Sequence, residues 1–256
     1  SSSLRKNYSY DGKEKFNGFT KDHNRMDSDA IVKGYMAVYE SESFQDLLKI
    51  NDTPTQTSRT TIALPLRTVQ NGADAMSATV IVRTKKGHGS GFSVSEDGYI
   101  ITNYHVISGT NPQKPMDIMI IDNSGATWPA RFIKASKDHD LALLKIDKVF
   151  ESSFVLPDGP NAKLLDKVVA IGTPMSESLS QSFSSGTVSG FRSVGIYELL
   201  QLSMAVNSGN SGGPLLTEDG SLKGVVTGKL VGNNVEGIGF AIPAYRIAEY
   251  LGLIFK

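Results

Sequence analysis

The chain has 256 residues, of which 39% are hydrophobic and 20% charged; these are ordinary globular proportions, unlike those of a disordered chain. Its 26 Lys and Arg residues balance its 26 Asp and Glu residues, so no bulk charge attracts nucleic acid or anionic lipid. The absence of cysteine excludes disulfide bonds and thiolate metal sites and leaves the redox state of the compartment undetermined. We therefore expect a folded domain that binds its partner at a local site, with no nucleic-acid partner.

Residues 1–75 are interpreted as an N-terminal extension. Its first 28 residues are polar and show no hydrophobic period, so we expect the extension to be partly flexible. Apolar residues then recur at helical spacing, as in Val32, Tyr35 and Met36, which predicts one or two short helices. No apolar run is long enough for a membrane span, and the opening residues lack the apolar stretch of a signal peptide. The chain is therefore either cytoplasmic or given without a removed leader.

After Met76 the pattern changes to short strands and tight turns. A first series includes ATVIVRT, FSVSEDGYIITN and MDIMIIDNSGATWPARFI, whose strand-like pieces are separated by Gly-containing turns. A second series includes KVVAIG, GTVSGF, YELLQLSMAV, PLLTEDGSLKGVVTGKL and EGIGFAIP. These two β-rich halves, about 76–150 and 160–243, predict two β-barrels packed side by side.

The end of the chain is the exception to this β pattern. Ala244, Ile247 and Leu251 share one face at helical spacing, which predicts a C-terminal helix. We therefore assign residues 76–256 to a single all-β domain with a terminal helix.

Ser211 is the candidate nucleophile. A serine hydroxyl is a poor nucleophile at neutral pH, so acyl transfer requires a base and fixed donors for the developing oxyanion. In SGNSGGPLL the flanking glycines allow successive backbone N–H groups to point into one concavity. We expect Gly209, Asn210 and Ser211 to form this oxyanion hole, with the N–H groups of Gly209 and Ser211 as donors. An isolated glycine-flanked serine usually marks only a turn, but GNSGGP before an apolar strand is more specific.

His105 and Asp140 are the candidate base and orienting acid. His105 lies at the end of a predicted strand in GYIITNYHVI, where a lone histidine would more often be structural. In KDHDLALLKI, Asp140 directly precedes an apolar strand, so a partly buried carboxylate could accept a hydrogen bond from the imidazole. Asp138 is a rival carboxylate further from that strand, and we expect it to be solvated. His139 should point the other way and be structural.

Five motifs in order, TNYHV, DLALLKI, AIGTP, GNSGGPL and GFAIP, resemble the signature of HtrA/Deg-like serine proteases of the trypsin fold. The resemblance covers about residues 76–252 and implies two packed six-stranded β-barrels and a serine endopeptidase activity. It also implies that His105 takes the Ser211 proton and later protonates the leaving amine, with Asp140 orienting it.

The same resemblance bears on activation. Asn210 stands where digestive trypsin-like enzymes have an aspartate that pairs with a newly cut amino terminus. An asparagine cannot form that ion pair, so ordering of the loop is the control that the resemblance implies. The alternative is a loop that is always ordered.

The resemblance also locates the pocket for the residue before the cut bond. Its walls are expected to come from the segment before the nucleophile and from a later strand at 225–230. The residues expected to line it are Ala205, Val206 and Asn207 from the first, and Thr227 and Leu230 from the second. Neither stretch contains an acidic residue, so Val206 and Leu230 favour a small or medium apolar residue at this position. An inward-facing Lys229 would instead favour an acidic residue, and the alternative is that these are simply core positions.

The resemblance implies protein or peptide substrates and an extracytoplasmic location. HtrA-like proteins commonly carry a peptide-binding PDZ domain after the protease domain, and we expect none here because the sequence stops after the terminal helix. Residues 1–75 are candidates for contacts between copies in a homo-oligomer, for packing on the barrels, or for covering the cleft. We expect no cofactor and no metal, because the histidines show no paired ligand spacing.

Two other functions are compatible with the sequence. One is a catalytically silent trypsin-like scaffold that binds peptides or proteins, although an intact His105, Asp140 and Ser211 argues against it. The other is an esterase or another acyl-transfer enzyme, which the same three residues could support.

Overall fold

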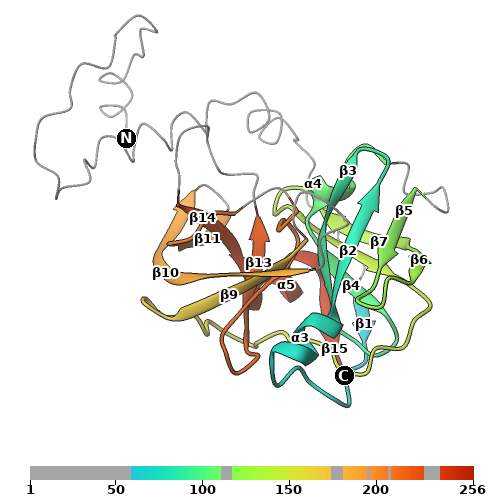
Figure 1. The fold of residues 1–256 in the computed structure, drawn as a ribbon, viewed down its shortest axis with the longest axis horizontal. Helices are drawn as coiled ribbons and strands as arrows, with labels where there is room; N and C mark the ends of the chain where they lie inside the picture. Colours follow the sequence, from blue (N-terminus) through green and yellow to red (C-terminus); the bar gives the residue numbers. More distant parts are fainter. Residues whose placement is uncertain (1–58, 111–116, 174–180, 195–196, 207–208, 228–236) are drawn as a thin grey trace, which may run out of the picture.

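The structure, a computed structural model, describes residues 59–256 except for the segments 111–116, 174–180, 195–196, 207–208 and 228–236. Two β-sheets, one from each half of this region, lie side by side (Figure 1). The predicted all-β class with a C-terminal helix is confirmed. The helices predicted around Val32 to Met36 lie outside the described residues.

The first half is a curled antiparallel sheet of seven strands in the order β6-β5-β2-β3-β4-β8-β7. Its strands are β2 (Thr79–Thr84), β3 (Gly87–Ser93), β4 (Tyr99–Thr102), β5 (Ile118–Ile121), β6 (Thr127–Pro129), β7 (Arg131–Ser136) and β8 (Leu141–Lys145). It differs from the expected closed six-stranded barrel because β6 and β7 form its two edges. The Ala130 N–H still donates to the Ile118 carbonyl oxygen at 3.0 Å, and directly after it the chain continues as β7 on the opposite edge.

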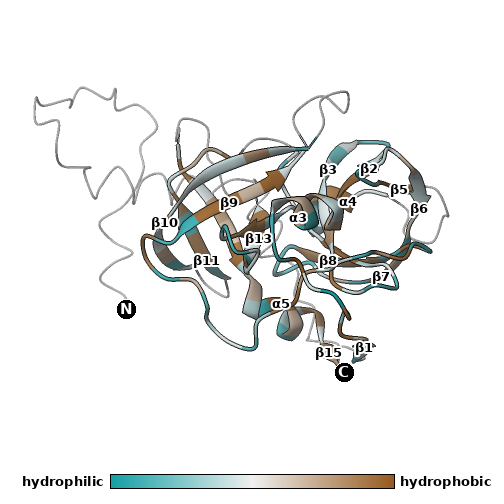
Figure 2. Cartoon of the chain, turned by 60° about the horizontal axis from the view of Figure 1, so that its bottom comes forward, coloured by the Kyte–Doolittle hydropathy of each residue, from teal (hydrophilic) through white to brown (hydrophobic). Residues whose placement is uncertain are grey.

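The second half is a closed six-stranded barrel, as expected. Its strands are β9 (Lys167–Gly172), β10 (Ser182–Val194), β11 (Tyr197–Leu202), β12 (Pro214–Leu216), β13 (Leu222–Thr227) and β14 (Gly239–Pro243). The order β10-β11-β14-β13-β12-β9 closes because β9 pairs with both β10 and β12. Figure 2 shows the apolar stretches of β9 and β13 in brown.

Three helices and two end strands complete the described chain. They are α3 (Gly72–Ala78), α4 (Tyr104–Ile107), α5 (Ala244–Leu251), β1 (Thr60–Ile62) and β15 (Leu253–Phe255). The predicted apolar face of the terminal helix is confirmed, because Ala244, Ile247 and Leu251 are all buried. Gly252 ends α5 in the left-handed conformation, with φ 59°, as is common for glycine after a helix. The chain then pairs β15 in parallel with β1, so residues near 60 are already attached to the domain.

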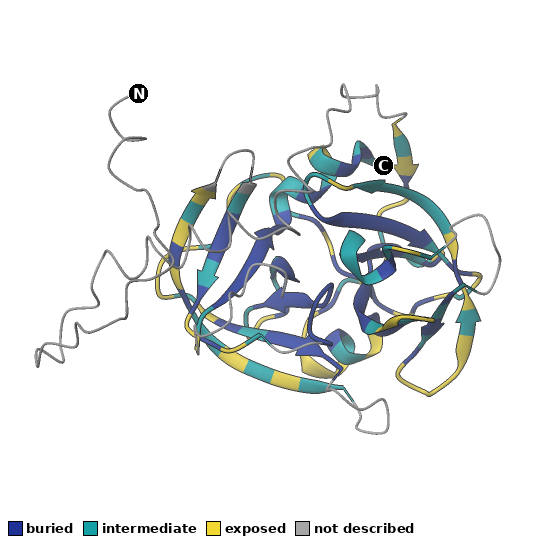
Figure 3. Cartoon of the chain, turned by 90° about the horizontal axis from the view of Figure 1, so that it is seen from above, coloured by how far each residue is buried: buried dark blue, intermediate teal, exposed yellow. Residues whose placement is uncertain are grey.

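The core consists of three clusters of buried side chains. One fills the first sheet, one fills the barrel, and the largest joins the two halves and α5. In this joining cluster Phe92 of β3 packs edge-on against Phe154, with ring centroids 5.3 Å apart. Figure 3 shows buried strand segments toward the interior and exposed segments at the outer edge. The shared cluster fixes the halves relative to each other, which a site built from both of them requires.

Candidate active site

The end of β4 and the start of β8 bring His105 and Asp140 together. These strands are antiparallel neighbours with Thr102 opposite Ala142, so the residues just beyond them meet at one edge. His105 Nδ1 lies 2.8 Å from Asp140 Oδ2, and the His105 backbone N–H donates to Oδ1 at 2.9 Å. The Asp140 side chain is 8% exposed and that of His105 is 27% exposed. The carboxylate therefore holds both the ring and the backbone of His105, while part of the imidazole stays open to a reactant.

Asp140 receives a third donor from the other half of the molecule. Thr227 at the end of β13 donates its hydroxyl to Asp140 Oδ2 at 3.1 Å, although the sequence places Thr227 among the pocket residues. Asp140 is also one of two described non-glycine residues with positive φ, at 53°, a conformation that Asp and Asn tolerate better than most residues. The Tyr104 N–H donates to the Asp140 carbonyl oxygen at 3.1 Å and helps to hold this backbone.

The turn that carries Ser211 packs against the residues on both sides of His105. A Cβ on Gly212 would come within 3.0 Å of the Asn103 nitrogen. A Cβ on Gly89 would lie 2.7 Å from a Val106 methyl carbon and 2.9 Å from the Ser211 carbonyl oxygen. Glycine is therefore required at both positions, and the nucleophile turn lies directly beside α4. Ser211 itself is 7% exposed.

Ser90 on β3 is a contact residue of this turn that the sequence alone does not single out. Its buried hydroxyl donates to the Gly209 carbonyl oxygen at 2.6 Å and accepts from the Thr173 N–H at 3.1 Å. Its own N–H donates to the Ser211 carbonyl oxygen at 2.8 Å. Ser90 therefore holds the backbone on both sides of Asn210.

Asn210 lies inside the turn rather than along an open face. It is 4% exposed, and a Cβ on Gly172 of β9 would collide with its side chain. Gly209 next to it has φ 104°, which only glycine adopts readily. Of the three expected oxyanion residues, Gly209 and Ser211 remain the predicted donors.

Replacing Ser90 with alanine should lower kcat for peptide hydrolysis about 10- to 100-fold with a smaller change in KM. The change leaves the buried Thr173 N–H and Gly209 carbonyl without their partner, a loss of about 1–3 kcal/mol that falls on the candidate oxyanion turn. Steady-state kinetics and thermal unfolding measured together test this prediction.

Ser93→Ala is the matched control, because Ser93 is also fully buried on β3 and donates to the Ser95 carbonyl oxygen at 2.8 Å. It should cost similar stability while kcat stays near wild type. Equal losses of kcat in the two variants would assign Ser90 a purely structural role.

His139, one of the two rival residues, packs against the terminal helix. The His139 ring stacks on Tyr250 of α5, with centroids 3.6 Å apart and planes 15° from parallel. Burial lowers the pKa of His139 below its usual value, despite the nearby carboxylates of Asp138 and Glu249. Asp140, not Asp138, is the carboxylate that the structure joins to the His105 ring.

The expected pocket residues are described only in part. Val206 is half-buried, and a Cβ on Gly239 would lie close to both it and the Met204 carbonyl oxygen. Ala205 is exposed and Thr227 is directed at Asp140, whereas Asn207 and Leu230 lie outside the described residues. Val206, whose contact with Gly239 is described, therefore remains a candidate for the pocket wall.

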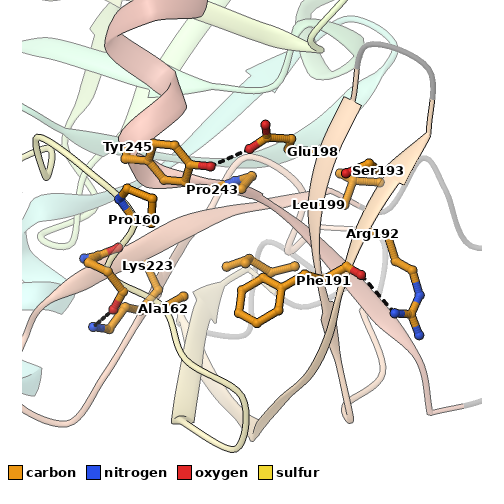
Figure 4. Close-up of a pocket in the computed structure, with 12 residues that line it drawn as sticks. Pro160, Ala162, Phe191, Arg192, Ser193, Glu198, Leu199, Lys223, Pro243 and Tyr245 are labelled. Atoms are coloured by element: carbon orange, nitrogen blue, oxygen red, sulfur yellow. Dashed lines mark hydrogen bonds between the residues drawn. The ribbon is translucent and has the colours of Figure 1, made fainter.

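A separate cavity of about 200 Å³ lies on the second half, between β10, β11 and the start of α5 (Figure 4). Phe191, Leu199 and Tyr245 line it, and none of the candidate catalytic residues does. Glu198 at its rim accepts hydrogen bonds from Tyr245 and Arg246, which hold the pKa of the carboxyl below its usual value. This rim carboxylate is therefore already paired within the chain.

Among the described residues, no three His, Asp or Glu side chains gather in a way that could hold a metal ion. No helix in the same part of the chain is both long and apolar enough to cross a bilayer.

Comparison with known proteins yields a consistent set of similarities. A model of the trypsin-like peptidase domain matches residues 89–225. The magnetosome formation protease MamE of Paramagnetospirillum magneticum is 38% identical over 183 residues, which cover 68% of this chain and 24% of that protein. A probable periplasmic serine endoprotease, DegP-like, of Halomonas elongata is 35% identical over 175 residues, covering 65% of this chain and 35% of the relative.

The fold is also similar to a solved structure. The crystal structure of the serine endoprotease from Yersinia pestis superposes with a TM-score of 0.57 and 34% identity, covering 70% of this chain and 64% of that one. The chain thus spans only 24% to 35% of the length of the two curated relatives described above.

Proposed function

The chain belongs to the family of trypsin-like peptidase domains and is homologous to HtrA and DegP-like serine proteases, and from this premise we propose that it is a serine endopeptidase acting through Ser211. The observation that supports this most is the 2.8 Å contact of His105 Nδ1 with the buried Asp140 carboxylate, beside the turn that carries Ser211. A binding module needs no such oriented imidazole next to a glycine-flanked serine.

In the proposed reaction His105 Nε2 takes the Ser211 hydroxyl proton as the oxygen attacks the peptide carbonyl carbon. The N–H groups of Gly209 and Ser211 stabilise the oxyanion of the tetrahedral intermediate. As the C–N bond breaks, the imidazolium gives its proton to the leaving amine. A water molecule, deprotonated by the same imidazole, then attacks the acyl-enzyme, and the imidazolium returns its proton to the Ser211 oxygen as the carboxylic acid is released. Asp140 keeps the Nδ1 proton in place and stabilises the imidazolium throughout.

The proposed substrates are unfolded or exposed protein segments with a small or medium apolar residue before the cut bond. Val206 supports this preference, and the described residues of the two predicted walls include no carboxylate. Similarity to a probable periplasmic serine endoprotease, DegP-like, supports an extracytoplasmic location for this chain. Assembly into a homo-oligomer through residues 1–75 is part of the proposal, and residues 1–58 lie outside the described part of the chain.

Labelling with a fluorophosphonate probe tests the proposal. The folded protein should form one covalent adduct, and peptide mapping should place it on Ser211. Incubation with an unfolded protein should then give cuts that follow small or medium apolar residues. Absence of an adduct on folded protein would favour the silent scaffold, and turnover of simple esters without any peptide cleavage would favour an esterase.

A further inference from the structure

The turn that carries Asp140 lies against the C-terminal helix. This turn, residues 137–140, joins β7 to β8, and both strands pack against α5. The Asp140 N–H closes the turn by donating to the Lys137 carbonyl oxygen at 3.3 Å. Asp140 completes it with a φ of 53°, a conformation that glycine adopts more readily than a residue with a side chain. A turn with its functional residue in this region needs surrounding contacts to hold it.

His139 provides such contacts from the position directly before Asp140. Its imidazole stacks on the Tyr250 ring of α5, with centroids 3.6 Å apart and planes 15° from parallel. Nδ1 of the same ring shares a hydrogen bond of 2.8 Å with the Ser136 hydroxyl at the end of β7. The ring is therefore held by two elements, which restrains the peptide bond that joins His139 to Asp140.

The backbone on the other side of Asp140 is held by the candidate site itself. The Asp140 carbonyl oxygen accepts from the Tyr104 N–H at 3.1 Å and from the Asn103 side-chain amide at 2.9 Å. Between these two attachments, the carboxylate reaches His105 Nδ1 at 2.8 Å. Its direction therefore depends on how the chain is fixed before and after it, and release of the His139 ring would remove the first of these attachments.

The His139 imidazole is uncharged at neutral pH. Burial lowers its pKa and Arg246 of α5 lowers it further, whereas the carboxylates of Asp138 and Glu249 oppose this shift. Burial also raises the pKa of Tyr250, so its phenol keeps its proton. The contact is therefore a stack of two uncharged rings, which an aromatic hydrocarbon of similar size could also form.

We propose that His139 is a positioning residue for the reaction. Its contacts with α5 and β7 fix the turn that aims the Asp140 carboxylate at His105. This inference rests on the proposed endopeptidase function. The sequence alone predicts a purely structural histidine here, so a test has to separate loss of orientation from loss of stability.

Steady-state cleavage of an internally quenched peptide with valine before the cut bond tests the inference. His139→Ala should lower kcat about 10- to 30-fold with little change in KM, because a misdirected carboxylate impairs the base without touching the substrate. His139→Phe should restore kcat to within about threefold of wild type, since phenylalanine retains the stack on Tyr250.

The partner ring gives a test from the other side of the contact. Tyr250→Leu should lower kcat as His139→Ala does, and it tests the inference even where His139→Ala does not fold. The double variant should lose no more kcat than either single variant, because both changes remove the same contact.

The pH dependence of kcat/KM is a second readout of orientation. A displaced carboxylate stabilises the His105 imidazolium less, so the acid-side midpoint should move to lower pH in His139→Ala and stay in place in His139→Phe. Val188→Ala is the control for stability, because Val188 is fully buried in a barrel cluster whose described members include no residue of α5 or of the turn 137–140. Both alanine variants should lower the thermal unfolding midpoint by roughly 3 to 8 °C, but Val188→Ala should keep the kcat and pH profile of wild type.

The outcomes separate the two proposals. If His139→Ala and Tyr250→Leu kept the kcat and pH profile of Val188→Ala, His139 would be purely structural, and the inference would be overturned while the endopeptidase function stood. Equal losses of kcat in His139→Phe and His139→Ala would also overturn it, since the stack would then not fix the turn. No cleavage by wild type, together with no fluorophosphonate adduct on Ser211, would overturn both proposals.

Discussion

Replacing Ser211 with alanine should lower kcat for peptide hydrolysis by about six orders of magnitude with little change in KM. The hydroxyl is the atom that forms the acyl-enzyme, so no other described group can substitute for it. Alanine fits the site without strain, because Ser211 is buried and the flanking glycines carry the unusual φ angles. Burst-phase and steady-state kinetics on a quenched peptide measure the loss, and a thermal unfolding curve shows that the fold persists.

A control serine distinguishes this chemical loss from any general effect of removing a hydroxyl. Ser193 is exposed on β10 of the second half, and Ser193→Ala should be as active as wild type. Ser211→Ala should also lose the fluorophosphonate adduct completely. Residual activity above about one thousandth of wild type, in protein free of contaminating protease, would contradict the assignment of Ser211 as nucleophile.

Much of the fold could be predicted from the sequence because local patterns determine it. Alternating apolar residues between glycine-marked turns predict the strands, and the face shared by Ile247 and Leu251 predicts α5. The first half is expected to be a six-stranded barrel, and its seven-stranded sheet could not be predicted from local patterns. The consecutive strands β6 and β7 lie at opposite edges of the sheet, and this depends on the pairing order of all seven strands rather than on a local pattern.

In the candidate site, too, the residues that lie in local motifs could be predicted and those positioned by distant contacts could not. His105 and Asp140 stand out because each lies in a short motif at the end of an apolar strand, and the pairing of β4 with β8 then brings them together. Ser90 and Thr227 could not be recognised in this way. Their roles arise from hydrogen bonds to residues 119 and 87 positions away, and a buried serine or threonine in a strand has no local signature.

Asp140→Asn should lower kcat about 10⁴-fold while leaving the fold intact. Asparagine has the same shape and also tolerates the φ of 53° at this position. Its amide N–H would donate to His105 Nδ1, so the ring proton would sit on Nε2. A protonated Nε2 cannot accept the Ser211 proton. The fall should appear in kcat, and thermal unfolding should change little.

Two further variants show why the carboxylate, rather than its bulk, matters. Asp140→Ala should lose stability as well as activity, by roughly 2 to 5 kcal/mol, because it forces alanine into the left-handed region and removes the acceptor for the His105 N–H and the Thr227 hydroxyl. Asp138→Asn should be nearly as active as wild type, since that carboxylate is not joined to the imidazole. If Asp138→Asn lost as much activity as Asp140→Asn, the assignment of the orienting role to Asp140 alone would be wrong.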